Sequence, residues 1–303
     1  MIYTSNYLEQ EMPRVEKLIN KIGAGQNRTL LLDMIMAGGN IIKAESEYFQ
    51  WKIEETETLE DEMYAGVMEG AEYGKSGKDP VRKLLKNNCQ IFKAVAEISG
   101  TAQALNPDGI ADHLEKRVEE KLILIKWALN KAILEGTLQN EDESKPRKMN
   151  GLLNIIANTK DLENSKLEAK VFSDVMRLLD EQGNGGTDRL CFVNADLKEA
   201  IDNLFGEDSK NHLEIHAGNN TFGVLANTII TNYGNVHVVL DHNMPEGQMM
   251  FFDPAQVFLK VLRPFKIEAP VQDADSLKRV IIGEYSVMMK NPYSAVKVIN
   301  VNA

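Results

Sequence analysis

The longest helical pattern in the chain runs from Asn106 to Gly136. Its apolar residues recur at intervals of three and four and face away from charged ones, which is typical of an amphipathic helix. Asn106 is a suitable N-cap, Pro107 fits the first helical position, and Gly136 offers a left-handed exit. We expect a spine roughly 40 Å long, at about 1.5 Å per residue, on which a sheet is laid. The apolar stripe consists of Ile110, Leu114, Val118, Leu122, Ile125, Leu129, Ala132 and Ile133.

The chain ahead of the spine shows the pattern of a β excursion. An apolar run at 30–36 is followed by Phe49, Trp51 and Ile53, which alternate with polar residues. This period of two predicts a strand with one buried face. We expect residues 27–100 to form an extended β excursion from the body of the protein.

The chain after the spine predicts an α/β layer followed by strands. Ser165 and Glu168 form a capping-box pattern ahead of one helix, and Asn194 can cap another over 197–205. The strands expected beyond Gly206 lie at 221–231, 236–240, 249–252, 258–265, 277–289 and 295–301. This order predicts an α+β fold whose final strands return to the sheet beside the spine.

Charge and cysteine content narrow the classes of function. The 303 residues include 45 acidic and 34 basic side chains, a formal charge of -11, which argues against a surface that neutralises phosphates. Cys89 and Cys191 lie in apolar runs and are expected to be buried free thiols in a reducing compartment. Since neither a signal peptide nor an apolar run of membrane-spanning length is present, we expect the protein to stay in the cytoplasm at first.

The residues with possible chemistry do not form a recognisable active site. His212 and His216 are four apart, but neighbouring glycines make a helix doubtful and no third metal ligand is apparent, so solvated loop histidines are favoured. His237 and His242 are interpreted as surface or packing residues, and 145–148 as a solvated charged loop rather than a nucleic-acid patch. No serine or cysteine lies in a known nucleophile motif. We expect no catalytic residue, no metal site and no cofactor.

Four sequence blocks carry a family resemblance. They read IFKAVAEISGTAQAL ahead of the spine, RKMNGLLNII after it, YGNVHVVLDHNMPEGQMMFFDPAQVFLKVLRPF, and IIGEYSVMMKNPYSAVKVINV. Together, and in this order over roughly residues 85–301, they resemble the major capsid proteins of tailed bacteriophages, in the SU-ten-like branch.

The resemblance implies the Hong Kong 97 capsid fold. Its implied units are an N-terminal arm at 1–26, an extended β-hairpin E-loop at 27–88, a P-domain at 89–148 completed by 256–303, and an A-domain at 149–255. Within the arm, Val15–Ile22 predicts a short helix. We expect the E-loop to lie over a neighbouring subunit, in contact through Phe49, Trp51 and Ile53.

The resemblance also implies a structural function. We expect hexamers and pentamers of this chain to build an icosahedral shell around packaged double-stranded DNA, without sequence-specific DNA binding or membrane contact. The other implied partners are portal, scaffolding and decoration or head-completion proteins; scaffolding, where used, is expected as a separate protein. The implied location is the virion, assembled in the bacterial host cytoplasm. An encapsulin-type compartment is the alternative within the fold, and a cytosolic β-rich enzyme is the alternative of another class.

Overall fold

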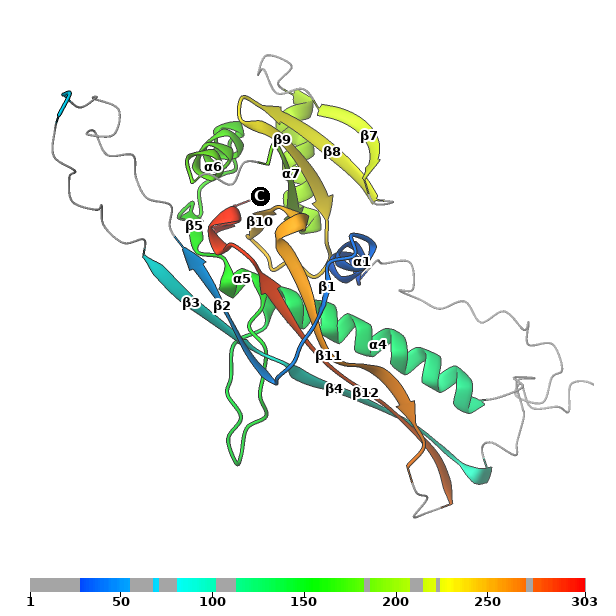
Figure 1. Ribbon diagram of the computed structural model, residues 1–303. Helices are drawn as coiled ribbons and strands as arrows, with labels where there is room; N and C mark the ends of the chain where they lie inside the picture. The colour runs from blue at the N-terminus through cyan, green and yellow to red at the C-terminus, as the bar shows by residue number, and fades with distance from the viewer. Residues whose placement is uncertain are drawn as a thin grey trace, which may run out of the picture.

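A four-stranded sheet lies along one long helix and forms an elongated half of the molecule (Figure 1). The computed structural model describes residues 28–54, 68–70, 81–101, 113–182, 186–207, 215–221, 224–270 and 275–302. β1 is parallel to β11, and β12 is antiparallel to both β11 and β4. The expected return to the sheet beside the spine is therefore confirmed for the strands at 258–265 and 277–289, whereas the strand expected at 295–301 joins the other sheet. In spatial order the strands are β1 (Ile41–Lys43), β11 (Val257–Glu268), β12 (Ser276–Met289) and β4 (Gln90–Ser99).

The spine helix is α4 (His113–Glu135), and it packs on one face of this sheet. Its 23 residues span about 35 Å. The part of the stripe nearest the centre of the molecule is the most deeply buried, because α1 (Leu30–Ala37), α5 (Leu152–Ile155) and the sheet all pack there. Of the predicted stripe, Leu114, Ile125, Leu129 and Ile133 are buried, Val118, Leu122 and Ala132 are half-buried, and Ile110 lies outside the described residues, as do Asn106 and Pro107.

The apolar run at 30–36 is a helix, so the expected β excursion is wrong in this part. It forms α1 (Leu30–Ala37), which packs in the main core, the larger hydrophobic cluster that the spine and the four-stranded sheet share. The side-chain oxygen of Asn130, buried in α4, accepts a hydrogen bond of 2.9 Å from the Leu32 N–H. Asn130 therefore satisfies a donor of the first turn that has no partner within the helix. A short apolar run has no period that separates helix from strand, so its contacts with distant segments, here Asn130 and the surrounding core, favour the helix.

The spine ends by close backbone approach rather than by a left-handed residue. Gly136 is not among the glycines of positive φ, which corrects the expected exit. Its carbonyl accepts a 2.8 Å hydrogen bond from the N–H of Gly151. A Cβ on Gly151 would lie 2.4 Å from the Gly136 nitrogen, so only glycine permits this contact.

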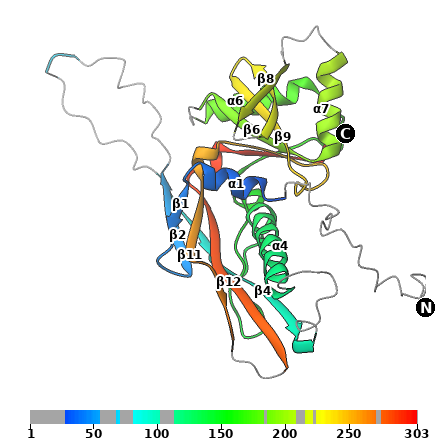
Figure 2. The same ribbon diagram turned by 90° about the vertical axis from the view of Figure 1, so that its right-hand side faces the viewer.

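A seven-stranded mixed sheet forms the other half of the molecule (Figure 2). β6 and β9 are parallel neighbours at its centre, and β10 is antiparallel to β6. Alternate residues of β6 point to opposite faces, and both faces are covered, which explains why the strand is buried along nearly its whole length. In spatial order the strands are β5 (Asn158–Asp161), β13 (Val296–Ile299), β10 (Met249–Phe252), β6 (Asp188–Val193), β9 (Gly234–Leu240), β8 (Val224–Thr231) and β7 (Ile215–Thr221).

Two helices cover one face of this sheet, and the main core covers the other. α6 (Ala169–Glu181) and α7 (Ala195–Glu207) pack on the face that includes Cys191 and Val193. Asn194 caps α7 as predicted, since its side-chain oxygen accepts from the Leu197 N–H at 3.0 Å. The expected capping box before α6 does not form, because the helix begins three residues later, with Glu168 as N-cap and no side-chain hydrogen bond there.

Sheet pairing crosses two of the boundaries expected from sequence. β13 pairs with β10 and β5, so the end of the segment 256–303 lies in the seven-stranded sheet and not beside the spine. β1 pairs with β11, so the segment 27–88 begins inside the main body and leaves it only after residue 43. The short connecting helices are α5 (Leu152–Ile155), η3 (Pro254–Gln256) and η4 (Pro292–Ser294). The expected arm helix lies outside the described residues.

Candidate assembly surfaces

A two-stranded ribbon prolongs the line of the four-stranded sheet (Figure 1). It consists of β2 (Tyr48–Glu54) and β3 (Arg82–Asn88). Only Cys89 separates β3 from β4, so the ribbon and the main sheet share one nearly continuous strand. An extended element of this kind offers much surface to a second molecule and little core to its own.

The predicted contact residues occupy one face of the ribbon. Phe49, Trp51 and Ile53 are each half-buried within their own subunit. The rings of Phe49 and Trp51 stack with centroids 5.7 Å apart, and the Lys260 ammonium lies 5.5 Å from the centre of the Phe49 ring. Part of this face is therefore covered by the subunit itself, and contact with a neighbour stays a prediction.

The opposite face of the ribbon is more open to a partner. Tyr48 is 43% exposed and Leu84 is 57% exposed, and both belong to this second face. Lys83, on the first face, instead donates a 2.9 Å hydrogen bond to the hydroxyl of Tyr293 in η4. The sequence predicts contacts only for the face with Phe49, Trp51 and Ile53. The stretch before Leu84 shows no clear alternation of apolar and polar residues that would indicate the second face.

The root of the ribbon is tied to the body by a buried arginine. The side chain of Arg147 is 10% exposed and that of Glu284, on β12, is 5% exposed; their Nη2 and Oε2 atoms are 3.4 Å apart. Arg147 Nε also donates to the Cys89 carbonyl at 2.7 Å, and its Nη1 lies 3.6 Å from a carboxylate oxygen of Glu47, just before β2. Arg263 contacts the other carboxylate oxygen of Glu284. The expectation of a solvated loop at 145–148 is therefore wrong for Arg147.

Two buried amides complete the root. Asn87 donates from Nδ2 to the carbonyls of Val287 and Asn150, at 2.8 and 3.0 Å, and its oxygen accepts from the Asn150 N–H at 2.7 Å. Asn88 donates to the Gln139 carbonyl at 2.9 Å. These bonds connect β3 to β12 and to the hairpin after the spine. Sequence reasoning missed both residues, since an Asn-Asn pair is more typical of a turn.

Arg147→Met tests the root directly. The change removes the cation from a largely buried cluster and leaves Glu284 with Arg263 alone, so we expect a loss of about 3 kcal/mol in the free energy of unfolding. Urea unfolding of the unassembled subunit measures it. Lys145→Met, at an exposed position of the same hairpin, is the matched control. An equal effect of the two changes would show that the cluster contributes little.

The two cysteines are buried free thiols, as expected. Burial, with a further contribution from the charge of Glu284, raises the pKa of Cys89 to about 11. Burial also raises the pKa of Cys191. Neither thiol is therefore a ready nucleophile at neutral pH.

The histidines do not assemble a metal centre in the described ranges. His237 lies on β9 and shares a 2.9 Å hydrogen bond with the Thr228 hydroxyl, and the exposed His242 follows that strand. His216 lies on strand β7, and His212 lies outside the described residues. Where the structure describes the chain, no cluster of three or more His, Cys, Asp and Glu side chains suits a metal ion. Among the same residues, no helix has the length and apolar composition of a membrane span.

A buried carboxyl at the end of β9 makes stability depend on pH. Asp241 is fully buried; its Oδ1 accepts from the N–H and the Nδ2 of Asn243, each at 2.8 Å. Oδ2 is buried without a hydrogen-bond partner in the described part of the chain. Burial raises the pKa of this carboxyl, although the Asn243 hydrogen bonds oppose the shift. The folded state therefore favours the protonated acid.

Asp241→Asn is expected to stabilise the subunit at neutral pH. A folded pKa above the unfolded value of about 4 gives a contribution that is most favourable at low pH and is lost as pH rises through the folded pKa. The neutral amide escapes this loss, so the Tm difference between variant and wild type should be small in acid and grow towards pH 7. Thermal unfolding across that range measures it. A difference that is constant with pH would contradict the assignment.

Comparison with known proteins gives a consistent result. The family model of the SU10 major capsid protein matches residues 3–302. The capsid of cyanophage A-1(L) superimposes with a TM-score of 0.67 at 9% identity, over 95% of this chain and 97% of that one. The SrpI encapsulin complex from Synechococcus elongatus PCC 7942 gives 0.67 at 9%, over 95% and 92%, and the capsid of the native GTA particle gives 0.64 at 11%, over 96% and 95%. A comparison with curated proteins gives no match.

The spine helix with its sheet, the α/β half and the long ribbon are those of a shell-forming protein with the Hong Kong 97 capsid fold. Within that class, the chain belongs to the SU10 major capsid protein family. It is a major capsid protein of the tailed-phage type, a structural component of the virion shell and not an enzyme.

Proposed function

We propose that this chain forms hexamers and pentamers that build an icosahedral head around double-stranded DNA. The observation that carries the proposal is the ribbon, whose root is tied to the body through Arg147 and Glu284 and whose second face exposes Tyr48 and Leu84. Such a surface favours association, and symmetric closure multiplies each modest contact around the shell. The ribbon then lies over the next subunit, as the E-loop of the assembly. We further propose an N-terminal arm at 1–26, an E-loop that leaves the body after residue 43, a P-domain around the spine and an A-domain around the seven-stranded sheet.

The charge of the chain supports a shell that encloses DNA rather than a protein that binds specific DNA sequences. With 45 acidic and 34 basic side chains, the chain carries a formal charge of -11 and has no excess of cations for binding phosphates. Weak binding of DNA to the inner surface of the shell favours both its packing and its later release. Portal, scaffolding and decoration or head-completion proteins would be the remaining partners, and assembly would occur in the bacterial host cytoplasm.

Expression of the protein followed by negative-stain microscopy tests the proposal. We expect closed shells, with scaffolding protein added where the subunit alone does not close. An encapsulin-type compartment is the competing proposal, because the encapsulin and the cyanophage capsid superimpose with the same TM-score. Particles isolated from the natural source separate the two: double-stranded DNA inside supports a phage head, whereas cargo protein without DNA supports a compartment.

A further inference from the structure

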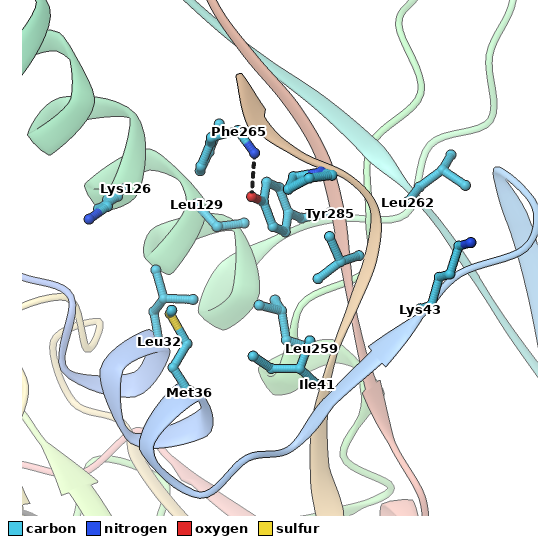
Figure 3. A pocket seen from close by; sticks show the side chains of 12 residues that line it. Leu32, Met36, Ile41, Lys43, Lys126, Leu129, Leu259, Leu262, Phe265 and Tyr285 are labelled. Atoms are coloured by element: carbon cyan, nitrogen blue, oxygen red, sulfur yellow. Dashed lines mark hydrogen bonds between the residues drawn. The ribbon is translucent and has the colours of Figure 1, made fainter. Parts of the chain in front are cut away.

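An apolar pocket of about 460 Å³ opens between α1, β1, β11, β12 and α4 (Figure 3). Its wall includes Leu32, Met36, Ile41, Leu259, Phe265 and Tyr285. Met36 is 52% exposed and Ile41 is 46% exposed, so large apolar surface remains open to solvent here. Exposed apolar surface that gathers around a hollow marks a place where something binds.

The chemistry of the wall favours apolar side chains over a polar ligand. Its lining is almost entirely apolar. The Tyr285 hydroxyl already accepts a 2.8 Å hydrogen bond from the Phe265 N–H, and that bond lies within the pocket (Figure 3). Lys43 and Lys126 also line the pocket. Small-molecule sites usually combine an apolar wall with several convergent polar groups, and this wall does not show that combination.

The N-terminal part of this chain offers a matching occupant. The 27 residues ahead of Arg28 lie outside the described structure, and they lead directly into α1, which forms one side of the pocket. Four apolar residues in this part are spaced i, i+3, i+4 and i+7, the spacing with which a helix enters an apolar groove. They are Val15, Leu18, Ile19 and Ile22.

The link between this segment and α1 permits a reversal of the chain. Residues 23–29 connect Ile22 to Leu30, and they include Gly23 and Gly25. Antiparallel helices are commonly joined by about 2–8 residues, so a helix at 15–22 can lie back against α1. Lys17 and Lys21 would then face solvent, because they lie on the other side of such a helix.

We propose that residues 15–22 dock as an amphipathic helix in the pocket of their own subunit. Ile19 and its neighbours then cover the exposed surface of Met36 and Ile41. The arm is thereby anchored beside the spine before any second subunit arrives.

Engineered disulfides in unassembled subunits test the docking, whatever shell the protein builds. Ile19→Cys is paired in turn with Met36→Cys and with Lys43→Cys, on two sides of the pocket; the native thiols are buried and do not compete. Under mild oxidation we expect loss of the free thiols in at least one pair and faster migration of a monomer band. Glu16→Cys with the same partners is the matched control, since Glu16 lies on the polar side of the helix, and it should crosslink much less. Equal crosslinking by the control, or crosslinks only between subunits, would overturn the proposal.

A second measurement needs no cysteine. Deletion of residues 1–26 should open the pocket, so the fluorescence of 8-anilinonaphthalene-1-sulfonate should rise above that of the full chain. Ile41→Asp in the truncated chain should reverse the rise, because it places a carboxylate in the apolar wall. Equal dye binding by full and truncated chains would overturn the proposal, as would a lipid found in the pocket of the full chain by native mass spectrometry.

Discussion

Leu129→Asp is expected to abolish recovery of the folded subunit. Leu129 is 2% exposed and lies where the spine meets α1 and the four-stranded sheet. A buried carboxylate without a partner costs several kcal/mol, against a total stability of about 5–15 kcal/mol for a typical domain. The soluble fraction and the far-ultraviolet circular dichroism of the purified variant measure the outcome.

Leu122→Asp provides a graded comparison on the same helix. Leu122 belongs to the same stripe but is only half-buried, so its carboxylate keeps part of its hydration and the loss should be smaller. Lys126→Asp, at an exposed position between them, should leave the fold intact. Folded, soluble Leu129→Asp protein would mean that the spine is not part of the core.

Removal of the ribbon tip is expected to abolish shell formation without unfolding the subunit. Glu54 and Arg82 are directly paired across β2 and β3, and the Arg82 Nε lies 2.8 Å from a Glu54 carboxylate oxygen. Residues 55–81 can therefore be replaced by Asn-Gly, which closes antiparallel strands in a two-residue turn. The shortened subunit keeps the Arg147 and Asn87 contacts at its root, so its Tm should stay close to that of the wild type.

Negative-stain microscopy and sedimentation measure the assembly of this variant. Loss of shells with an unchanged Tm would support the proposal that the ribbon makes contacts between subunits. Hydrogen exchange gives an independent measure on the wild type: amides of β2 and β3 should exchange faster in free subunits than in shells. Normal shells from the shortened chain would contradict the proposed role of the ribbon.

Several elements were predictable because their signals are local. The period of α4, the alternation in β2 and the Asn194 cap depend on residues close in sequence, and each is confirmed over the residues that the structure describes, for the spine from His113 onward. The secondary structure of the apolar run at 30–36 could not be predicted from such local signals. Its helical form depends on Asn130, about a hundred positions away, and on burial against the spine.

The root of the ribbon shows the same limit at the candidate assembly surface. Arg147 lies in a stretch of charged residues that is typical of solvent-exposed loops, and its burial depends on Glu284, Glu47 and the Cys89 carbonyl. No spacing in the sequence relates these groups, because strand pairing in the folded chain brings them together. The open pocket beside α1 is likewise formed by three parts of the chain that are distant in sequence: α1 with β1, α4, and β11 with β12.

The sequence by itself determined the spine and the strand periods, because helix and strand periods and turn residues act over a few positions. It also determined the acidic balance and the family resemblance, since these depend on the identity and order of the residues. Only the tertiary structure decided which sheet each strand joins, which half of the spine stripe is deeply buried, and which face of the ribbon stays open. β13 joins the seven-stranded sheet although it follows β12 of the other sheet by only a few residues. Long-range pairing and burial depend on which surfaces meet in the folded chain, and a local pattern does not contain that information.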